Sequence, residues 1–400
     1  MNKQLKSFIK KNRYLFEILN YISLVLIFIL NISYKKKISE IQTRAVKFVD
    51  KTNVLFIYSK KHFDPSKAIT STEYSGTYSW SKFFYEYLRS KYDSVEYIDL
   101  YDFQCAKINK NYKLIIGVLS WSFVLSKFLN RKALHIYIAV NAHPIYRNRK
   151  IIDESKKRGI DLTNECVNPI LQILCYYIAD VTLLAGNEFT KKTYLKYSPN
   201  VEIISISGGI LYEKFSPDYS QRDTNLIKIF YPTSFLGIRK GIFSFFDLLD
   251  ELSNYNFKSK LQVTITGKIP IDLRKIIFDK ALELSTCEII FSNWLSHENL
   301  VKEIQSSNIV VSCSLEEGQP HGVLEAIAGG CIPFVSVDCG IDLNNKFIFE
   351  NDIKKSAKKL SAIITRCEAD SSHKLSQNFI NILKKNNNWN NVITKINNYF

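Results

Sequence analysis

The sequence predicts an α/β protein made of two domains, each built around a parallel β-sheet. Three observations support this prediction. The chain has 400 residues, which exceeds the usual size of a single hydrophobic core. Its short apolar runs alternate with stretches of helical periodicity, which is the pattern of βαβ units. The polar, unpatterned segment 216–225 interrupts this alternation and is the best candidate for a domain boundary.

In the first half of the chain, the predicted strands are continuous apolar runs, as expected for parallel strands that are buried on both faces. These strands are 53–58, 95–100, 114–118, 134–140, 181–184 and 201–206. Apolar residues at helical spacing lie between several of them and predict helices. These helices are 80–92, 122–130, 170–178 and 188–197.

After the polar segment the same alternation starts again. The predicted strands are 226–231, 261–265, 288–291, 309–313 and 332–335. The predicted helices are 243–252, 273–284, 300–306, one that begins at the turn around Pro320, and the C-terminal pair 354–367 and 375–399. We therefore expect a first Rossmann-like domain over 50–217 and a second over 226–385, which face each other across a cleft. Open parallel sheets bind ligands at the carboxyl ends of their strands.

The chain is strongly basic, with a net charge of +16 and a pI of about 9.2. This charge favours anionic partners such as phosphorylated substrates or anionic lipid. The lysines are dispersed, and neither an Arg-rich tract nor basic residues interleaved with aromatics stand out. We therefore do not expect a nucleic-acid partner.

The eight cysteines are spread along the chain without a Cys-x-x-Cys pair. Several fall inside predicted strands or helices, where a cysteine behaves as a small buried hydrophobe. This pattern is typical of a reducing compartment. No His/Cys group has the spacing of a zinc site, so no metal site is expected.

The N-terminal region, residues 1–40, contains a mostly apolar stretch over 14–34. Its length would suffice to cross a bilayer, and it lacks the small-residue cleavage site of a secretory signal. Basic residues flank it on both sides, which also suits a helix lying in an anionic interface. We expect an anchor or membrane-associating helix, at the cytoplasmic face of the membrane; a helix docked on the domain is the alternative.

Two glutamates, Glu317 and Glu325, mark the most informative stretch of the chain. The predicted strand 309–313 leads into the turn Glu317-Gly-Gln-Pro-His321, where a helix begins. Proline suits the first turn of a helix, and the N–H groups at a helix start favour anions. Carboxylates are good acceptors for hydroxyl groups, as on a sugar ring or a ribose. The stretch therefore indicates a sugar-nucleotide site, although two ordinary surface glutamates would give a similar pattern.

A second group follows the first strand of the second domain. Arg239 and Lys240 lie in the loop between the strand 226–231 and the next predicted helix. A basic pair at such a junction can neutralise a diphosphate and stabilise it as a leaving group. Taken alone, the pair could equally be two exposed cations.

Together, these segments resemble the retaining GT-B glycosyltransferases of family 4. The stretch Glu317–Gly330 is similar to the Glu-x7-Glu signature of that family, and 239–241 is similar to its phosphate loop. Weaker similarities are found in the interdomain segment 208–217, the base-pocket segment 290–300 and the aromatic segment 387–389. The resemblance implies a GT-B architecture, in which the last helix, here 386–400, crosses back toward the first domain.

The resemblance also implies roles for individual residues. Lys240, helped by Arg239, would hold the phosphates of the donor. Glu325 would bind the ribose hydroxyls, and Glu317 would bind the sugar hydroxyls and orient the anomeric carbon. The main chain of the turn would contact sugar and phosphate, through Gly318, Pro320, His321 and Gly322.

Further roles concern the base and the first domain. Trp294 and Leu295 would flank the base of the donor. His143 follows a predicted strand and resembles the histidine that the family places near the reacting centre; a structural histidine is the alternative. Gly76 could let a loop approach the donor phosphate, or it could be a plain turn glycine.

The chain departs from the family pattern at two positions. Phe235 occupies a place where the family often has an arginine, and Gln319 one that is usually Phe or Tyr. The chain also contains no Asp-x-Asp, the spacing with which metal-dependent sugar transferases hold a divalent ion. We therefore expect no cofactor and no metal, with cations and a helix start in place of the metal.

The predicted function is transfer of a sugar from a nucleotide donor to a hydroxyl of a saccharide or lipid-linked saccharide, with retention, in surface polysaccharide biosynthesis. A sugar-nucleotide epimerase of similar build is the main alternative among enzymes, because it would need no acceptor. A membrane-tethered sugar-nucleotide-binding protein without catalytic activity is the alternative from another class. Both the nucleotide sugar and an anionic membrane surface are expected partners.

Overall fold

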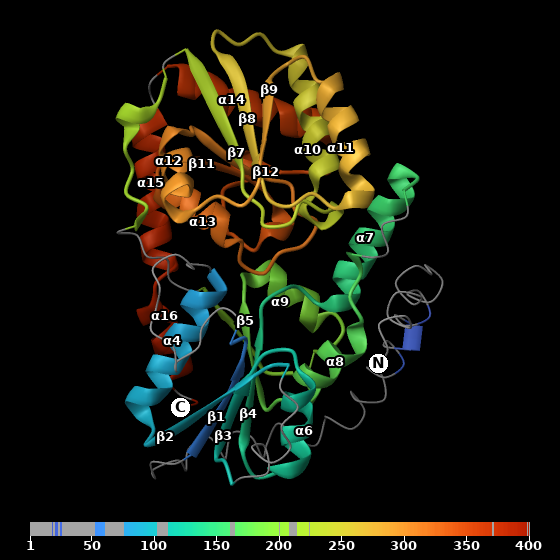
Figure 1. Ribbon diagram of the computed structural model, residues 1–400, viewed down its shortest axis with the longest axis vertical. Coiled ribbons are helices and arrows are strands. Elements are labelled where there is room, and N and C mark those ends of the chain that lie inside the picture. The colour runs from blue at the N-terminus through green and yellow to red at the C-terminus, as the bar shows by residue number, and fades with distance from the viewer. Residues whose placement is uncertain are drawn as a thin grey trace. The chain divides into compact units, whose positions relative to one another are not determined.

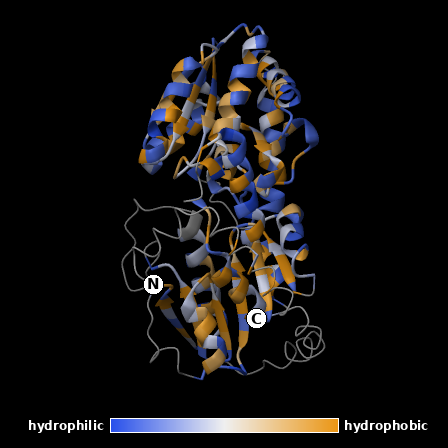
Figure 2. Ribbon diagram, turned by 90° about the vertical axis from the view of Figure 1, so that its right-hand side faces the viewer, coloured by the Kyte–Doolittle hydropathy of each residue, from blue (hydrophilic) through white to orange (hydrophobic). Residues whose placement is uncertain are grey.

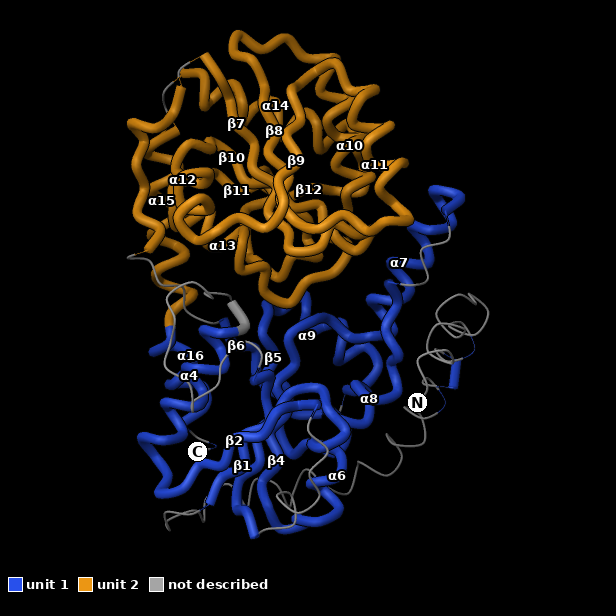
Figure 3. The backbone as a smooth tube through the Cα atoms, in the orientation of Figure 1, with its two compact units in different colours: residues 1–208, 389–400 blue, residues 209–388 orange. Residues whose placement is uncertain are grey.

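The computed structural model describes residues 53–60, 76–101, 111–160, 165–199, 201–207, 214–223, 225–369 and 372–397, with isolated positions besides. The chain forms two compact units (Figure 3), one made of 1–208 with 389–400 and the other of 209–388. Each unit contains one six-stranded sheet in which all neighbouring strands pair in parallel. The predicted α/β fold with two parallel sheets is confirmed.

The first unit has the strand order β2-β1-β3-β4-β5-β6. Its strands are β1 (Asn53–Tyr58), β2 (Ser94–Asp99), β3 (Leu114–Gly117), β4 (Leu134–Ala139), β5 (Val181–Ala185) and β6 (Ile203–Ile206). Its helices are α4 (Gly76–Lys91), α6 (Trp121–Leu129), α7 (Pro144–Arg158), α8 (Pro169–Ile178), α9 (Glu188–Leu195) and α16 (Trp389–Ile396). The element order alternates as the sequence pattern predicts.

Alternating side chains of the central strands build two separate cores, one on each face of this sheet. In β1, Leu55 and Ile57 join the core under α6, α7, α8 and α9, whereas Val54 and Phe56 join the core under α4 and α16 (Figure 1). All four side chains are fully buried. Burial on both faces explains why such strands are continuous apolar runs in the sequence (Figure 2).

The second unit has the strand order β12-β11-β10-β7-β8-β9. Its strands are β7 (Leu226–Tyr231), β8 (Lys260–Thr266), β9 (Glu288–Ser292), β10 (Ile309–Ser312), β11 (Ile332–Ser336) and β12 (Ile348–Phe349). Helices α10 (Ile242–Glu251), α11 (Ile271–Glu283) and α14 (Ile353–Glu368) cover one face, and α12 (His297–Ser306), α13 (His321–Ala328) and α15 (Ser372–Asn386) cover the other (Figure 1). In chain order this is the doubly wound 3-2-1-4-5-6 arrangement, whose order reverses between β7 and β10.

Two helical assignments differ from the sequence prediction. Helix α7 was not predicted, because charged residues outnumber the buried Ile145, Ile151 and Ile152 that form its apolar stripe. The single helix predicted over 375–399 is two helices, α15 and α16, separated at residues 387–388. Two consecutive asparagines, which are poor helix formers, stand at this break.

Several predicted features lie outside the described residues. The N-terminal helix predicted over 14–34 is described only at positions 18, 21, 22 and 25, and the resemblance at 208–213 is not described. Within the part of the chain that is described, no helix combines the length and the apolar character needed to cross a membrane.

Candidate active site

The loops that follow β7 and β10 meet at the point where the strand order of the second sheet reverses. Open α/β sheets bind ligands at this place, at the carboxyl ends of the strands. The β7 loop contains a short 3-10 helix over Ile238–Lys240 and then Gly241, whose φ of 73° lies in the left-handed region. The β10 loop passes so close that a Cβ added at Gly241 would lie 1.8 Å from the carbonyl oxygen of Cys313. Glycine is therefore required at this crossing of the two loops.

The meeting of the two loops brings the predicted cations and one predicted carboxylate together. Oε1 of Glu317 accepts a hydrogen bond from Nη1 of Arg239 at 3.0 Å and a charged contact from Nζ of Lys240. The N–H group of Leu315 donates to the carbonyl of Arg239 at 2.9 Å and fixes one loop on the other. Glu317 is only 7% exposed, so this is a largely buried ion cluster.

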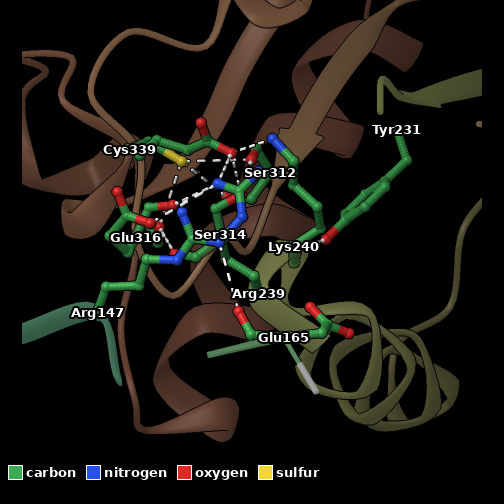
Figure 4. Close-up of polar contacts among 11 residues, drawn as sticks. Arg147, Glu165, Tyr231, Arg239, Lys240, Ser312, Ser314, Glu316 and Cys339 are labelled. Atoms are coloured by element: carbon green, nitrogen blue, oxygen red, sulfur yellow. Dashed lines mark hydrogen bonds and ion pairs between the residues drawn. The ribbon is translucent and has the colours of Figure 1, made fainter. Parts of the chain in front are cut away.

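Serine hydroxyls form hydrogen bonds with the ion cluster and with one another (Figure 4). The hydroxyl of Ser314 donates to Oε1 of Glu317 at 3.3 Å and accepts from the hydroxyl of Ser312 at 3.3 Å. Ser336 in turn donates to the carbonyl of Ser314 at 2.5 Å. The sequence reasoning missed these serines. The signal was available for Ser314, which stands three residues before Glu317 at the end of a buried strand.

Cys339 and Asp338 also lie next to Glu317. The thiol of Cys339 lies 3.3 Å from the hydroxyls of both Ser312 and Ser336, and burial raises its pKa to about 11. This thiol is therefore neutral at physiological pH. The carbonyl of Asp338 accepts the N–H group of Glu317 at 2.8 Å. The Glu317 backbone is thus fixed from the β11 side while its side chain faces the cations.

Glu316 is a second carboxylate at the cluster that the sequence did not single out. It is 1% exposed, and its Oε2 lies 3.8 Å from Nη1 of Arg239. The same guanidinium nitrogen donates to the Glu316 carbonyl at 3.0 Å. Arg239 is therefore held on the β10 loop by main-chain and side-chain acceptors together.

The helix that follows the turn begins at His321, one residue after Pro320, which is the N-cap. Burial lowers the pKa of His321 to about 4, and the negative Glu317 opposes this shift only in part. Its imidazole is therefore neutral at pH 7 and adds no positive charge. Gly322 lets the helix pack on the β7 loop, since a Cβ there would lie 2.9 Å from the Pro232 Cβ.

Glu325 lies on α13 and is 9% exposed. No hydrogen bond or ion pair reaches its carboxylate from the described part of the chain, and burial raises its pKa to about 8. An acid in this environment is mostly protonated at pH 7 and can be ionised at little cost near pH 8. It is well suited to receive hydroxyl groups from a ligand.

The raised pKa predicts how stability changes with pH. The folded form holds its proton up to about pH 8, whereas the unfolded chain releases it near pH 4.5. The unfolded state therefore binds fewer protons in this window, and the free energy of unfolding falls by up to about 1.4 kcal/mol per pH unit. Glu325→Gln should match the wild type near pH 4.5 and become the more stable of the two as pH approaches 8. Urea unfolding at several pH values measures this, with the exposed Glu298→Gln as control; parallel profiles would contradict it.

The residues predicted to flank the base follow β9, the edge strand of the second sheet. Trp294 is 66% exposed and Leu295 is half-buried. Because parallel strands end at one edge of the sheet, these side chains and the two cations share that edge. An exposed indole face at such a position can stack on a base.

The first unit contains two of the predicted site residues, His143 and Gly76. His143 is fully buried as the N-cap of α7, where Nδ1 accepts from the N–H of Ile145 at 3.3 Å and Nε2 contacts the hydroxyl of Tyr176 at 2.9 Å. Burial lowers its pKa to about 3. This geometry accounts for a structural histidine, and a catalytic role stays a prediction. Gly76 is the first residue of α4.

No cluster of three or more His, Cys, Asp or Glu side chains suited to a metal ion occurs among the residues described. Each described cysteine is a free thiol. The polar chemistry of the site described above includes two cations, three carboxylates, hydroxyl groups, the neutral imidazole of His321 and the thiol of Cys339.

Residues 220–389 match the family model described as glycosyl transferases group 1. This segment contains Arg239, Lys240, Trp294, Glu317 and Glu325. The predicted resemblance is confirmed to that extent, while retention and membership of family 4 stay predictions. No curated protein matches the sequence significantly.

The matches to solved structures of similar fold cover nearly the whole of those chains. Sucrose-phosphate synthase from Thermosynechococcus elongatus has a TM-score of 0.66 at 13% identity and covers 87% of this chain and 98% of its own. HepE from Anabaena, in complex with UDP and glucose, has a TM-score of 0.57 at 12% identity and covers 86% and 98%. A glycosyltransferase from Rickettsia africae has a TM-score of 0.56 at 14% identity and covers 87% and 99%. At these identities the likeness establishes the fold.

Proposed function

We propose that the protein is a glycosyltransferase that moves a sugar from a nucleoside diphosphate donor to a hydroxyl acceptor, with retention of the anomeric configuration. The observation that carries this proposal is the meeting of Arg239, Lys240 and Glu317 where the order of the second sheet reverses. Phosphate-binding cations and a hydroxyl-binding carboxylate within one hydrogen-bonded cluster suit a sugar diphosphate. The match of this segment to the group 1 family model supports the same conclusion.

The proposal assigns each part of the donor to a group in the second unit. Lys240 and Arg239 neutralise the diphosphate and stabilise it as it leaves. Glu317 accepts hydrogen bonds from the sugar hydroxyls, and Glu325 accepts them from the ribose. Trp294 stacks on the base. Because these groups supply the charge, no divalent metal is required in this scheme.

The acceptor and the location are parts of the same proposal. The basic charge of the chain and the apolar N-terminal stretch 14–34 support a lipid-linked saccharide acceptor at the cytoplasmic face of a membrane, in surface polysaccharide assembly. UDP and glucose in the HepE structure make UDP-glucose a reasonable first donor to test.

Binding of the donor is expected to raise the thermal unfolding temperature, because a ligand that binds only the folded state stabilises it. UDP-, GDP-, ADP- and CDP-linked sugars should be screened at a concentration about one hundred times a micromolar Kd, where the gain is about 2.7 kcal/mol. One nucleotide class should shift the transition, and Lys240→Ala should abolish the shift.

The reaction itself is then followed by NMR of the anomeric proton, with the stabilising donor and a panel of saccharide and lipid-linked acceptors. Donor consumption that depends on an acceptor and retains the configuration supports the proposal. Conversion of the donor to an epimer without acceptor would favour an epimerase instead. Stabilisation by none of the nucleotides, together with no turnover, would refute the function.

A further inference from the structure

The two cations assigned to the diphosphate are already occupied by a carboxylate of the protein. Arg239 and Lys240 both contact Oε1 of Glu317, and the side chains are 21%, 15% and 8% exposed, in the order Arg239, Lys240, Glu317. The internal carboxylate and an incoming diphosphate therefore draw on the same two positive charges. Two unit charges cannot neutralise the carboxylate and a diphosphate together.

We propose that Glu317 is an internal competitor of the diphosphate, so that the site discriminates a sugar nucleotide from the nucleoside diphosphate left after transfer. This inference rests on the proposed function and deepens it. A sugar nucleotide brings a diphosphate for the cations and hydroxyl donors for the carboxylate that the cations release. A nucleoside diphosphate brings the diphosphate without the hydroxyl groups of the sugar.

Burial gives this competition its strength. Glu317 is 7% exposed, and its N–H group is fixed on the carbonyl of Asp338 at 2.8 Å, so the loop does not carry the carboxylate into water. Ser314 supplies one neutral donor at 3.3 Å. A buried carboxylate that loses two cationic partners is strongly destabilised. The hydroxyls of the sugar remove that cost, and it returns when the sugar has left.

The neighbouring carboxylate does not compete in the same way. Glu316 approaches only Arg239 among the two cations, with Oε2 at 3.8 Å, and the Glu316 carbonyl accepts from the same guanidinium at 3.0 Å. Lys240 is thus held by Glu317 and not by Glu316. After transfer, Glu317 recaptures Lys240 and Arg239, and the diphosphate product is released faster.

Calorimetry with inorganic pyrophosphate tests the competition independently of base and sugar. Glu317→Gln removes the competing charge and keeps the shape, so pyrophosphate should bind at least about tenfold tighter than to the wild type, which corresponds to about 1.4 kcal/mol. Glu350→Gln is the control, because it removes one carboxylate from the ion pair with Lys359 in the same unit. Its pyrophosphate affinity should stay within about twofold of the wild type.

A second measurement compares a nucleoside diphosphate with its sugar nucleotide, using the nucleotide that binds best among UDP, GDP, ADP and CDP. The wild type should prefer the sugar nucleotide, and Glu317→Gln should lose most of that preference. Glu317→Asp keeps the charge but withdraws it by one methylene, and should tighten pyrophosphate by at least about threefold. This variant keeps the test decisive if the glutamine variant does not fold.

The outcomes separate the inference from the function on which it rests. If the wild type binds nucleotides but pyrophosphate affinity is unchanged or weaker in the folded Glu317 variants, the competition is refuted and the proposed function stands. If neither the wild type nor the variants bind pyrophosphate or any nucleotide, both are refuted. Tightening in the Glu317 variants but not in Glu350→Gln supports the inference.

Discussion

Lys240→Ala is expected to reduce sugar transfer by about two to three orders of magnitude, because it removes one of the two cations that the proposed function assigns to the diphosphate. Lys240 lies in the β7 loop with its ammonium group on Glu317 and its carbonyl accepting the hydroxyl of Tyr231. The carbonyl contact does not depend on the side chain, so the loop should keep its path. Arg239 still pairs with Glu317 at 3.0 Å, and the carboxylate is not left alone. Steady-state transfer kinetics measure the effect.

The control for this substitution is Lys302→Ala, which removes a lysine from an exposed pair on α12 with a side chain that is 68% exposed. It should leave turnover unchanged, since exposed pairs contribute little. The unfolding transition of Lys240→Ala should stay cooperative, which separates a lost charge from a lost fold. Turnover within about twofold of the wild type in Lys240→Ala would contradict the role assigned to this lysine.

Gly241→Ala should destabilise the second unit by at least about 3 kcal/mol and also weaken donor binding. The added Cβ would lie 1.8 Å from the carbonyl oxygen of Cys313, and the φ of 73° is itself unfavourable for alanine. The β7 loop and the β10 loop must therefore move apart. That movement separates Arg239 and Lys240 from Glu317. Denaturant unfolding and donor titration, performed on the same preparation, measure both effects.

A matching substitution at Gly159 separates the cost of backbone strain from the cost of a steric clash. Gly159 ends α7 with a φ of 65°, but a Cβ there would meet nothing within 4 Å. Gly159→Ala should therefore cost only the backbone strain of about 1 to 2 kcal/mol. Equal losses in the two variants would show that the crossing of the loops is not as tight as the geometry indicates.

The strands were predictable because burial on both faces leaves a local trace in the sequence. Strand β7 begins and ends where its apolar run does, at 226 and 231. Helix α7 left no such trace, since few of its buried residues are apolar and most of its other positions are charged. The periodicity did not show the break between α15 and α16, because both helices carry a similar apolar pattern, whereas the resemblance implied a separate last helix over 386–400.

The residues of the site were predictable, but their pairing was not. Strand ends and residue types placed Arg239, Lys240 and Glu317 at the carboxyl edge of the sheet. That β7 and β10 are neighbours is a property of the sheet order, which one sequence does not contain. For the same reason the contact of Ser336 with Ser314 and the contact of His143 with Tyr176 could not be foreseen. Their partners are distant in the chain and meet only in the folded units.

Helix α16 belongs to the first unit, although the whole of the second unit precedes it in the chain. Its Trp389 stacks on Phe83 with ring centroids 4.1 Å apart and meets Trp80 edge-on at 5.3 Å, while Val392 and Ile396 are fully buried. During synthesis on the ribosome, the aromatic face of α4 therefore stays uncovered until residues 389–396 emerge. The unit whose translation starts first is therefore completed only after the whole of the second unit has been translated.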